Sequence, residues 1–353
     1  MKTYNVLGIM SGTSMDGIDL AFCVFTHDKN KWSFQIKEAE TVPYDESWLE
    51  MLSESRSLSR DKIRIYDLKY GAFIGNLAMD FITRYNLKPD LIASHGHTIL
   101  HEPDQGITFQ LGDGKAIANK TKIKTINDFR SLDVSLGGQG APLVPIGDAL
   151  LFSEYDYCVN LGGFANISYD EDGKRIAFDI CPLNIVLNEY SLKLGKAFDK
   201  NGDFAKAGNL ISPLFDQLNN LDYYSKSPPK SLGKEWVIEI ANPILHKYQN
   251  YNPKDILNTL VEHMALQISS HLVTSTANSL FTGGGTFNNH LINRIKKYSK
   301  TKIGTPSNTI VSFKEAMIFG FLGVLKDRNE INCLSSVTGA QHDCVSGMVH
   351  IPV

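Results

Sequence analysis

The chain has 353 residues, a length typical of two domains. Of these residues 42% are hydrophobic and 21% charged, a composition typical of a soluble globular protein. Its formal net charge of −3 argues against the basic face that nucleic-acid binding needs, and no block of like charges predicts binding to a membrane surface. No uninterrupted apolar run approaches the roughly eighteen residues of a membrane-spanning helix.

The N-terminal apolar run is too short for a signal peptide, because the sequence turns polar at Ser11. The five cysteines are odd in number and widely spaced, and none forms a C-x-x-C pair. We therefore expect free thiols in a reducing cytoplasm.

The first predicted elements form a hairpin. Residues 4–10 (YNVLGIM) and 18–25 (IDLAFCVF) are predicted strands, the second because its apolar residues alternate with their neighbours. The stretch GIMSGTSMDGID (8–19) spans the connection and carries three glycines, three hydroxyl side chains and two carboxylates. Farther along, apolar residues at helical spacing predict a helix over 61–86, and DLIASHG predicts a buried strand over 90–96.

Residues 128–147 are rich in glycine, proline and polar residues, which predicts an irregular connection and a lobe boundary. Residues 155–182 then read as strand, glycine loop, strand, Asp-Gly turn and strand, which repeats the opening design. A long helix is predicted over 254–279, followed by a strand, a glycine turn and a helix beginning near residue 288. A last apolar helix is predicted over 312–327.

Three glycine-containing turns predict a phosphate site, because bare backbone N–H groups can converge on anionic oxygens. The carboxylates of Asp16 and Asp19 could hold Mg²⁺ directly or through water. A Walker A loop is excluded, since G-x-x-x-x-G-K-[ST] is absent and a strand follows the first loop. A surface turn would explain one such loop, whereas three favour a shared ligand.

Eight motifs follow one another in the order found in 1,6-anhydro-N-acetylmuramic acid kinases: GIMSGTSMDGID, FQLGD, DFR, GGQGAPLVP, NLGGFANIS, FTGGG, KEA and SVTGA. The chain resembles that family from residue 7 to about residue 340. The resemblance implies an α/β, two-lobed sugar kinase/Hsp70/actin-type (ribonuclease H-like) fold with an ATP cleft between the lobes. We expect an N-terminal lobe over 1–130, completed by about 335–353, and a C-terminal lobe over 131–334.

The resemblance implies an ATP- and Mg²⁺-dependent kinase of peptidoglycan recycling. Such an enzyme opens the 1,6-anhydro ring of 1,6-anhydro-N-acetylmuramic acid with water and phosphorylates O6, giving N-acetylmuramic acid 6-phosphate and ADP. Its partner is a small amino sugar, with no nucleic acid or membrane, and the family is compatible with a homodimer. Two alternatives stay open: a kinase of the same fold for another amino sugar, and a nucleotide-dependent sensor that has lost catalysis.

The resemblance also implies roles for individual residues. Asp179 would be the base that activates water, Arg130 would contact the sugar or the transferring phosphate, and Glu315 would orient the sugar or the water. His97 and Asn184 would join Arg130 and Asp179 around the sugar, and Asp16 would hold Mg²⁺. The residues placed against ATP are Ser11, Gly12, Thr13, Ser14, Met15, Asp16, Gly17, Ile18, Asp19, Asn160, Gly162, Gly163, Gly283, Gly284 and Gly285.

Each of these residues also has an ordinary structural reading. An aspartate near a proline often closes a turn, Arg130 could be a surface cation, and Glu315 could be a first-turn helix acid. His95, His97 and His101 superficially suggest zinc, but three histidines without a carboxylate are more often core or rim residues. For His97 we favour a place near the sugar, where family members commonly have glutamine.

The chain departs from the family pattern D-T-G-P-(G/A)-N at residues 179–184, which read D-I-C-P-L-N. The carboxylate, the proline and the asparagine persist, so the base is retained. The added bulk of Ile180, Cys181 and Leu183 leaves the sugar specificity open. We expect Cys181 to pack and not to act as a nucleophile, because the reaction needs no covalent step.

Overall fold

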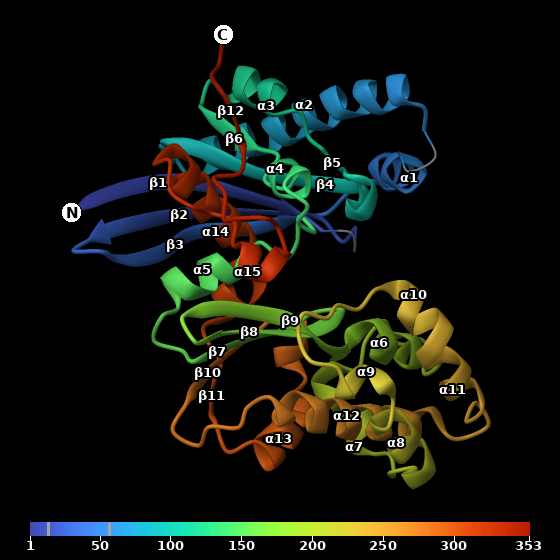
Figure 1. Ribbon diagram of the computed structural model, residues 1–353. Helices are drawn as coiled ribbons and strands as arrows, with labels where there is room; N and C mark the ends of the chain where they lie inside the picture. The colour runs from blue at the N-terminus through green and yellow to red at the C-terminus, as the bar shows by residue number, and fades with distance from the viewer. Residues whose placement is uncertain (13–14, 56–57) are drawn as a thin grey trace. The chain divides into compact units, whose positions relative to one another are not determined.

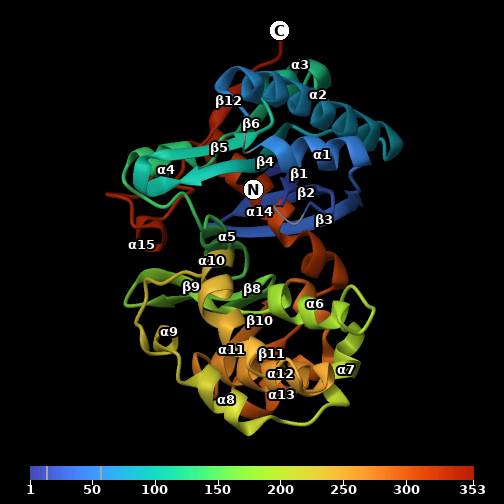
Figure 2. The ribbon, with the colours of Figure 1, turned by 90° about the vertical axis from the view of Figure 1, so that its right-hand side faces the viewer.

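The computed structural model describes residues 1–12, 15–55 and 58–353, which form two compact units (Figures 1 and 2). Unit 1 comprises Met1–Leu151 and Phe313–Val353, and unit 2 comprises Phe152–Ser312. Each unit contains one β-sheet with helices packed on it, as the predicted α/β fold requires.

Unit 1 is built on a seven-stranded sheet. Its strands are β1 (Lys2–Ser11), β2 (Ile18–Asp28), β3 (Lys31–Val42), β4 (Leu91–Glu102), β5 (Ile107–Leu111), β6 (Thr125–Asn127) and β12 (Met348–His350). Its helices are α1 (Glu46–Glu54), α2 (Arg60–Arg84), α3 (Gly114–Thr121), α4 (Ser131–Ser135), α5 (Val144–Leu151), α14 (Asn308–Asp327, which begins in unit 2) and α15 (Ser335–Thr338).

Unit 2 is built on a five-stranded sheet. Its strands are β7 (Tyr157–Leu161), β8 (Phe164–Glu171), β9 (Lys174–Pro182), β10 (Asn278–Thr282) and β11 (Lys302–Gly304). Its helices are α6 (Asn184–Leu192), α7 (Asp203–Lys206), α8 (Ser212–Asn219), α9 (Asp222–Ser225), α10 (Lys234–Trp236), α11 (Asn242–His246), α12 (Pro253–Ser270) and α13 (Asn289–Tyr298).

The two sheets share one strand pattern. In unit 1, β3, β2 and β1 form an antiparallel meander, and β4 and β6 continue parallel to β1. In unit 2, β9, β8 and β7 form the meander, and β10 and β11 continue parallel to β7. This duplicated order confirms the predicted ribonuclease H-like architecture, and it places the two hairpin turns, β1–β2 and β7–β8, at equivalent positions of their sheets.

The core of unit 1 follows from the alternation of side chains along β1. Leu7 and Ile9 lie in one buried cluster with Tyr70 and Ile74 of α2. Gly8 lies on the other face, against α14, where an added Cβ would come within 2.0 Å of the Ala316 carbonyl oxygen. In unit 2 a single cluster joins the sheet to α6, α8, α12 and α13 (Figure 1).

Gly8→Ala is expected to destabilise the protein by about 1–3 kcal/mol or more, because the new methyl group must displace the backbone of α14. Gly320→Ala is the matched control, since its Cβ would sit 3.4 Å from the Gly8 Cα, an ordinary van der Waals contact, and alanine favours helix. The midpoint of urea unfolding measures both. Equal midpoints for the two variants would contradict the close approach of β1 and α14.

Most predicted elements are confirmed; two predicted segments differ, and several observed elements, among them β3, β5, β6 and β12, were not predicted. The polar edge strand β3 went unrecognised because charged residues occupy much of it. Helix α12 ends at Ser270, with His271 as its C-cap, short of the predicted residue 279. The segment predicted to be irregular contains α4 and α5.

The bounds of the units also differ from the expected ones. Unit 1 runs on to Leu151, beyond the boundary expected near residue 130, and resumes at Phe313, well before residue 335. The reason lies in α5 and α14, which are joined by a buried ion pair of 2.6 Å between Asp148 and Lys314. Together with the packing of α14 on β1, this pair attaches both segments to the first sheet.

Among the described residues, α14 is the one helix long and apolar enough to cross a membrane by length and composition. Within the protein, however, 67% of its apolar window is buried. The core helix of a globular protein has the same length and composition, and the packing of α14 on β1 accounts for its apolar sequence.

Candidate active site

The turn after β1 is held by close backbone approaches in unit 1. The Met15 N–H donates to the Gly12 carbonyl at 3.3 Å. A Cβ on Gly17 would lie 2.7 Å from the Val42 carbonyl oxygen, so β3 limits this position to glycine. Ile18 begins β2 and is fully buried. The predicted phosphate residues Thr13 and Ser14 lie outside the described residues.

Ser11 ends β1, and its hydroxyl is engaged in a buried polar network. Its Oγ lies 2.6 Å from the Tyr44 hydroxyl, 2.9 Å from the Tyr70 hydroxyl and 3.0 Å from His97 Nδ1. The two tyrosine hydroxyls are themselves 2.5 Å apart. The side chain of Ser11 thus anchors the base of the turn, and the same network ties His97 of β4 to it.

Acidic side chains gather beside this turn. Burial raises the pKa of Asp19, a Thr41 hydroxyl that donates at 2.6 Å opposes the shift, and the charge of Asp16 adds to it. Burial also raises the pKa of Glu315 in α14; the charge of Arg130 lowers it, whereas Asp19 and Asp16 raise it further. A divalent cation would relieve this repulsion and prefers such oxygen ligands, so the donor set fits Mg²⁺.

Arg130, at the start of α4, is half-buried and points its guanidinium at two acceptors. Nε and Nη2 lie 3.0 and 2.9 Å from His95 Nε2, and Nη1 donates to the Gly140 carbonyl at 3.0 Å. Three of its five N–H groups are thereby used among the described residues. The alternative interpretation of Arg130 as an ordinary surface cation is therefore disfavoured.

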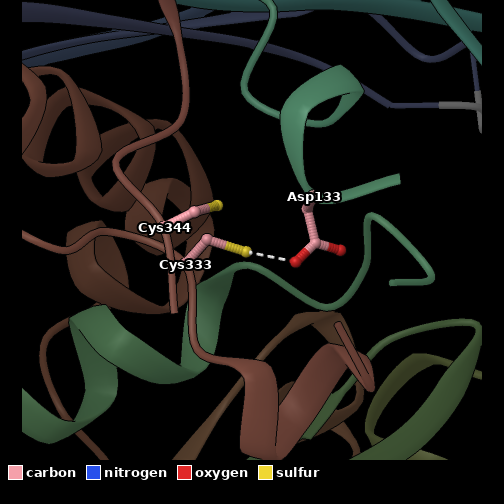
Figure 3. A group of neighbouring side chains, drawn as sticks. All are labelled: Asp133, Cys333 and Cys344. Atoms are coloured by element: carbon pink, nitrogen blue, oxygen red, sulfur yellow. Dashed lines mark hydrogen bonds between the residues drawn. The ribbon is translucent and has the colours of Figure 1, made fainter. Parts of the chain in front are cut away.

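The three histidines near β4 do not converge on one point. His95 bonds Arg130, His97 bonds Ser11, and His101 bonds the Thr108 hydroxyl at 3.1 Å. The only group of three metal-ligating side chains found among the described residues is a different one, made of Asp133, Cys333 and Cys344 (Figure 3). The zinc interpretation of the histidines has no geometric support.

Asp133, Cys333 and Cys344 form a buried cluster in unit 1 that the sequence did not reveal, because 200 residues separate Asp133 from Cys333. Figure 3 shows the Cys333 thiol directed at the Asp133 carboxylate, a hydrogen bond of 3.1 Å. The carboxylate also accepts from the Thr338 hydroxyl at 2.7 Å and from the Gly140 N–H at 2.8 Å. The cluster is thus satisfied by hydrogen bonds and pins the C-terminal segment to α4. All five cysteines are free and buried.

In unit 2 two glycine turns lie together. Cβ atoms added at Gly283 and Gly285 would contact Leu161 at 2.9 and 2.7 Å, which places the β10 turn against the β7–β8 turn. Asn160 also contributes, since its Oδ1 lies 2.5 Å from the Cβ position of Gly283, whose φ is +84°. Only glycine allows this approach at such a φ.

The outer edges of these turns are open. A Cβ at Gly163 or Gly284 would meet nothing within 4 Å among the described residues. Asn184, at the start of α6, donates its side-chain amide to the carbonyls of Gly162 at 2.8 Å and Leu161 at 3.2 Å. The two turns are therefore fixed by their mutual contact and by Asn184, while Gly163 and Gly284 stay open on the outer side.

Asp179 lies on β9 beside these turns, at a β-bulge. Ala165 pairs with Cys181 while Asn166 pairs with Asp179, so Ile180 is the extra residue. Strand alternation directs Asp179 to the face opposite Phe178, and the bulge lets the consecutive residues Ile180 and Cys181 both enter the core. The Asp179 side chain is half-buried, whereas Ile180 and Cys181 enter the core.

Three hydrogen bonds fix Asp179. Its N–H donates to the Lys230 carbonyl at 3.3 Å. Its Oδ2 accepts the Leu232 N–H at 2.9 Å, and its carbonyl accepts the Tyr223 hydroxyl at 2.6 Å. No described group bonds Oδ1. Burial raises the pKa of the carboxyl group above its ordinary value of 3.8, and the Leu232 bond only partly opposes the shift. Asp179 is thus a carboxylate with one oxygen held and one available.

The three residues that depart from the family pattern all pack inward. Ile180, Cys181 and Leu183 are at most 1% exposed and belong to the core of unit 2. Burial also raises the pKa of the Cys181 thiol, as expected of an inert packing cysteine. Their bulk is accommodated in the core, with Leu183 against Gly285.

Comparison with known proteins gives a match along the whole chain. A family model described as anhydro-N-acetylmuramic acid kinase matches residues 4–352. The anhydro-N-acetylmuramic acid kinase of Francisella tularensis subsp. novicida is 32% identical over 372 residues, which cover 98% of this chain and 98% of that protein. The Bacillus cereus protein of the same name is 29% identical over 382 residues, with 98% and 99% covered.

Solved structures with similarity to the chain include a ROK family glucokinase from Streptomyces griseus in complex with glucose and AMPPNP. It gives a TM-score of 0.39 and 10% identity over 90% of this chain and 98% of that one. The activator of the 2-hydroxyisocaproyl-CoA dehydratase from Clostridium difficile, with bound ADPNP, gives a TM-score of 0.40 and 13% identity over 92% and 97% of the two chains.

Proposed function

The chain belongs to the anhydro-N-acetylmuramic acid kinase family and is a kinase, and from this premise we propose its reaction and the residues that perform it. The protein uses ATP to convert 1,6-anhydro-N-acetylmuramic acid and water into N-acetylmuramic acid 6-phosphate and ADP. Breakdown products of peptidoglycan supply the substrate, and the reaction takes place in the cytoplasm.

Asp179 is the proposed base. Water attacks C1 and gives its proton to Oδ1 of Asp179, while the C1–O6 bond breaks and its electron pair goes to O6. O6 then attacks the γ-phosphorus of ATP, and the bond to ADP breaks, so the phosphoryl group takes the place of a general acid. The single observation that carries this assignment is that the Asp179 side chain lies outside the core of unit 2, with Oδ2 held by the Leu232 N–H and Oδ1 unbonded among the described residues.

The phosphoryl group is proposed to meet Arg130, whose two remaining N–H groups and positive charge suit its oxygens. Asp16 and Asp19 are the residues that would hold Mg²⁺, which when bound neutralises charge on the phosphates, and Glu315 would orient the sugar or the water. His97, fixed through Ser11, is proposed to contact the sugar.

The backbone turns are proposed to bind ATP. Residues 12–19 of unit 1 and the Gly162–Gly163 turn of unit 2 would bind phosphates, and the Gly283–Gly285 turn, held by Asn160, would lie against the adenosine. The open edges of Gly163 and Gly284 support this assignment, because backbone approaches a nucleotide closely only where no Cβ intervenes.

ADP release with different sugars tests the proposal. With ATP and Mg²⁺, 1,6-anhydro-N-acetylmuramic acid is expected to support turnover, whereas N-acetylmuramic acid and N-acetylglucosamine are not, because neither has a ring whose opening delivers O6. Faster turnover with either plain sugar would replace the proposal by a kinase for another amino sugar. Absence of turnover with every sugar would favour a nucleotide sensor.

A further inference from the structure

His95 of β4 is a buried histidine, 4% exposed, that no step of the proposed reaction uses directly. Its ring bridges two elements of unit 1. Nδ1 lies 2.8 Å from the Gly96 carbonyl oxygen, and Nε2 faces Nε and Nη2 of Arg130 at 3.0 and 2.9 Å. These contacts settle where the ring proton resides.

A carbonyl oxygen can only accept, so Nδ1 must carry the proton that it donates to Gly96. Both guanidinium nitrogens can only donate, so Nε2 must be the unprotonated acceptor. Burial, and secondly the charge of Arg130, lower the pKa of His95 well below its usual value, which keeps the ring neutral. His95 is therefore a neutral acceptor with a fixed tautomer.

This partner distinguishes Arg130 from four other arginines of the chain. Arg84, Arg175, Arg294 and Arg328 each pair with a carboxylate, which neutralises their charge. No described carboxylate lies within ion-pair distance of Arg130, and its partners are a neutral imidazole and the carbonyl of Gly140. Arg130 is thus oriented without losing its charge.

The second neutral acceptor is itself fixed. The Gly140 N–H donates to Oδ2 of Asp133 at 2.8 Å, and the Thr338 hydroxyl also holds Asp133. The Cys333 thiol donates to the same carboxylate (Figure 3). The guanidinium is consequently held from two sides, by His95 of β4 and by the loop that the Asp133 cluster anchors. Two N–H groups, one on each terminal nitrogen, remain for a ligand.

We infer that His95 is a positioning residue, which through its neutral Nε2 aims the charged guanidinium of Arg130 at the transferred phosphoryl group. The inference rests on the proposed function, in which Arg130 meets that group. An acidic residue at position 95 would hold the guanidinium equally well but would cancel the charge that the phosphoryl oxygens require.

Two substitutions test separately the hydrogen bond that His95 accepts from Arg130 and the one that it donates to Gly96. In His95→Gln the side-chain oxygen can reach the position of Nε2 and accept from Arg130, whereas in His95→Asn the amide reaches only the position of Nδ1 and can donate to Gly96. We expect His95→Asn to lower kcat by about 10–100-fold, the usual loss when an orienting partner is removed, with a smaller change in the KM for the anhydro sugar. His95→Gln should restore most of kcat.

Two further experiments test whether His95 acts through the guanidinium of Arg130. In an Arg130→Ala background, His95→Asn should lower kcat no further, because it acts only through the guanidinium. His263→Gln is the matched control for loss of a buried, doubly bonded histidine: His263 contacts Asn219 and Tyr224 at 2.8 and 2.9 Å in unit 2, and its replacement should lower thermal stability without lowering kcat.

The possible outcomes distinguish a failure of the positioning role of His95 from a failure of the proposed role of Arg130. If Arg130→Ala itself keeps the parent kcat, the proposed role of Arg130 fails. If Arg130→Ala is impaired but His95→Asn matches the parent, or His95→Gln and His95→Asn are equally impaired, the positioning role fails while the proposed function stands.

Discussion

Replacing Asp179 by asparagine is expected to lower kcat for the anhydro sugar by about 10²–10⁴-fold while leaving the Kd for ATP near its parent value. The amide oxygen can still accept the Leu232 N–H, so the backbone contacts of β9 persist. What is lost is the ability of Oδ1 to take a proton from water. Steady-state kinetics and calorimetric titration with an ATP analogue measure the two quantities.

Asp170→Asn is the matched control, because Asp170 lies on the neighbouring strand β8 with its side chain 65% exposed and takes no proposed part in catalysis. Its kcat should equal that of the parent. Substantial residual phosphorylation of the anhydro sugar by Asp179→Asn would remove Asp179 as the base.

The raised pKa of Asp179 predicts how kcat/KM depends on pH. The base works only when ionised, and burial raises its pKa above 3.8, so kcat/KM should fall on the acid side at a higher pH than for an exposed aspartate. Because a raised folded-state pKa makes the ionised group destabilising, Asp179→Asn should be at least as stable as the parent at neutral pH. Inactivity without instability would exclude misfolding as the cause.

Replacing Arg130 by alanine is the second large expected effect, a loss of about 10²–10³-fold in kcat. The substitution removes the charge and both free N–H groups from the place where charge develops on the phosphoryl oxygens. Arg130→Lys should be impaired as well, since an ammonium group cannot keep the fork that binds His95 Nε2 and Gly140 together.

Arg84→Ala provides the control for loss of an arginine from the same unit. Its guanidinium pairs with Glu40 at 2.7 Å on the surface, with the side chain 57% exposed, and such pairs contribute little. Its kcat should be unchanged. A kcat for Arg130→Ala within a few-fold of the Arg84→Ala value would show that the phosphoryl group does not depend on Arg130.

The sequence predicts the architecture well where local signals are strong. The apolar alternation of β1 and β2, the Asp172-Gly173 turn between β8 and β9 and the helical spacing of α2 all correspond to observed elements. Strand β3 was not predicted, because an edge strand with one solvated face needs few apolar residues. The bounds of the units depend on the packing of α5 and α14, which are remote in sequence.

In the site, too, local features could be predicted from the sequence, whereas contacts between remote segments could not. Local motifs indicated Asp179, Arg130 and the glycine turns, because a resemblance carries residue types and spacing. Neither the tautomer of His95 nor the engagement of Ser11 by Tyr44 and Tyr70 could be predicted, since each depends on pairings between separate elements. The bulge at Ile180, which lets both Ile180 and Cys181 enter the core, is likewise visible only in the pairing of β8 and β9.

The fate of the water oxygen tests the central claim most directly, that hydrolysis of the anhydro bond and phosphorylation of O6 are one reaction. The enzyme is incubated with ATP, Mg²⁺ and 1,6-anhydro-N-acetylmuramic acid in ¹⁸O water, and the product is examined by mass spectrometry and NMR before C1 exchanges its oxygen with solvent. We expect ¹⁸O at C1 of a 6-phosphorylated sugar, in equal amount to ADP. A phosphorylated sugar that retains its anhydro bridge, or a product labelled on phosphate and not at C1, would contradict the account.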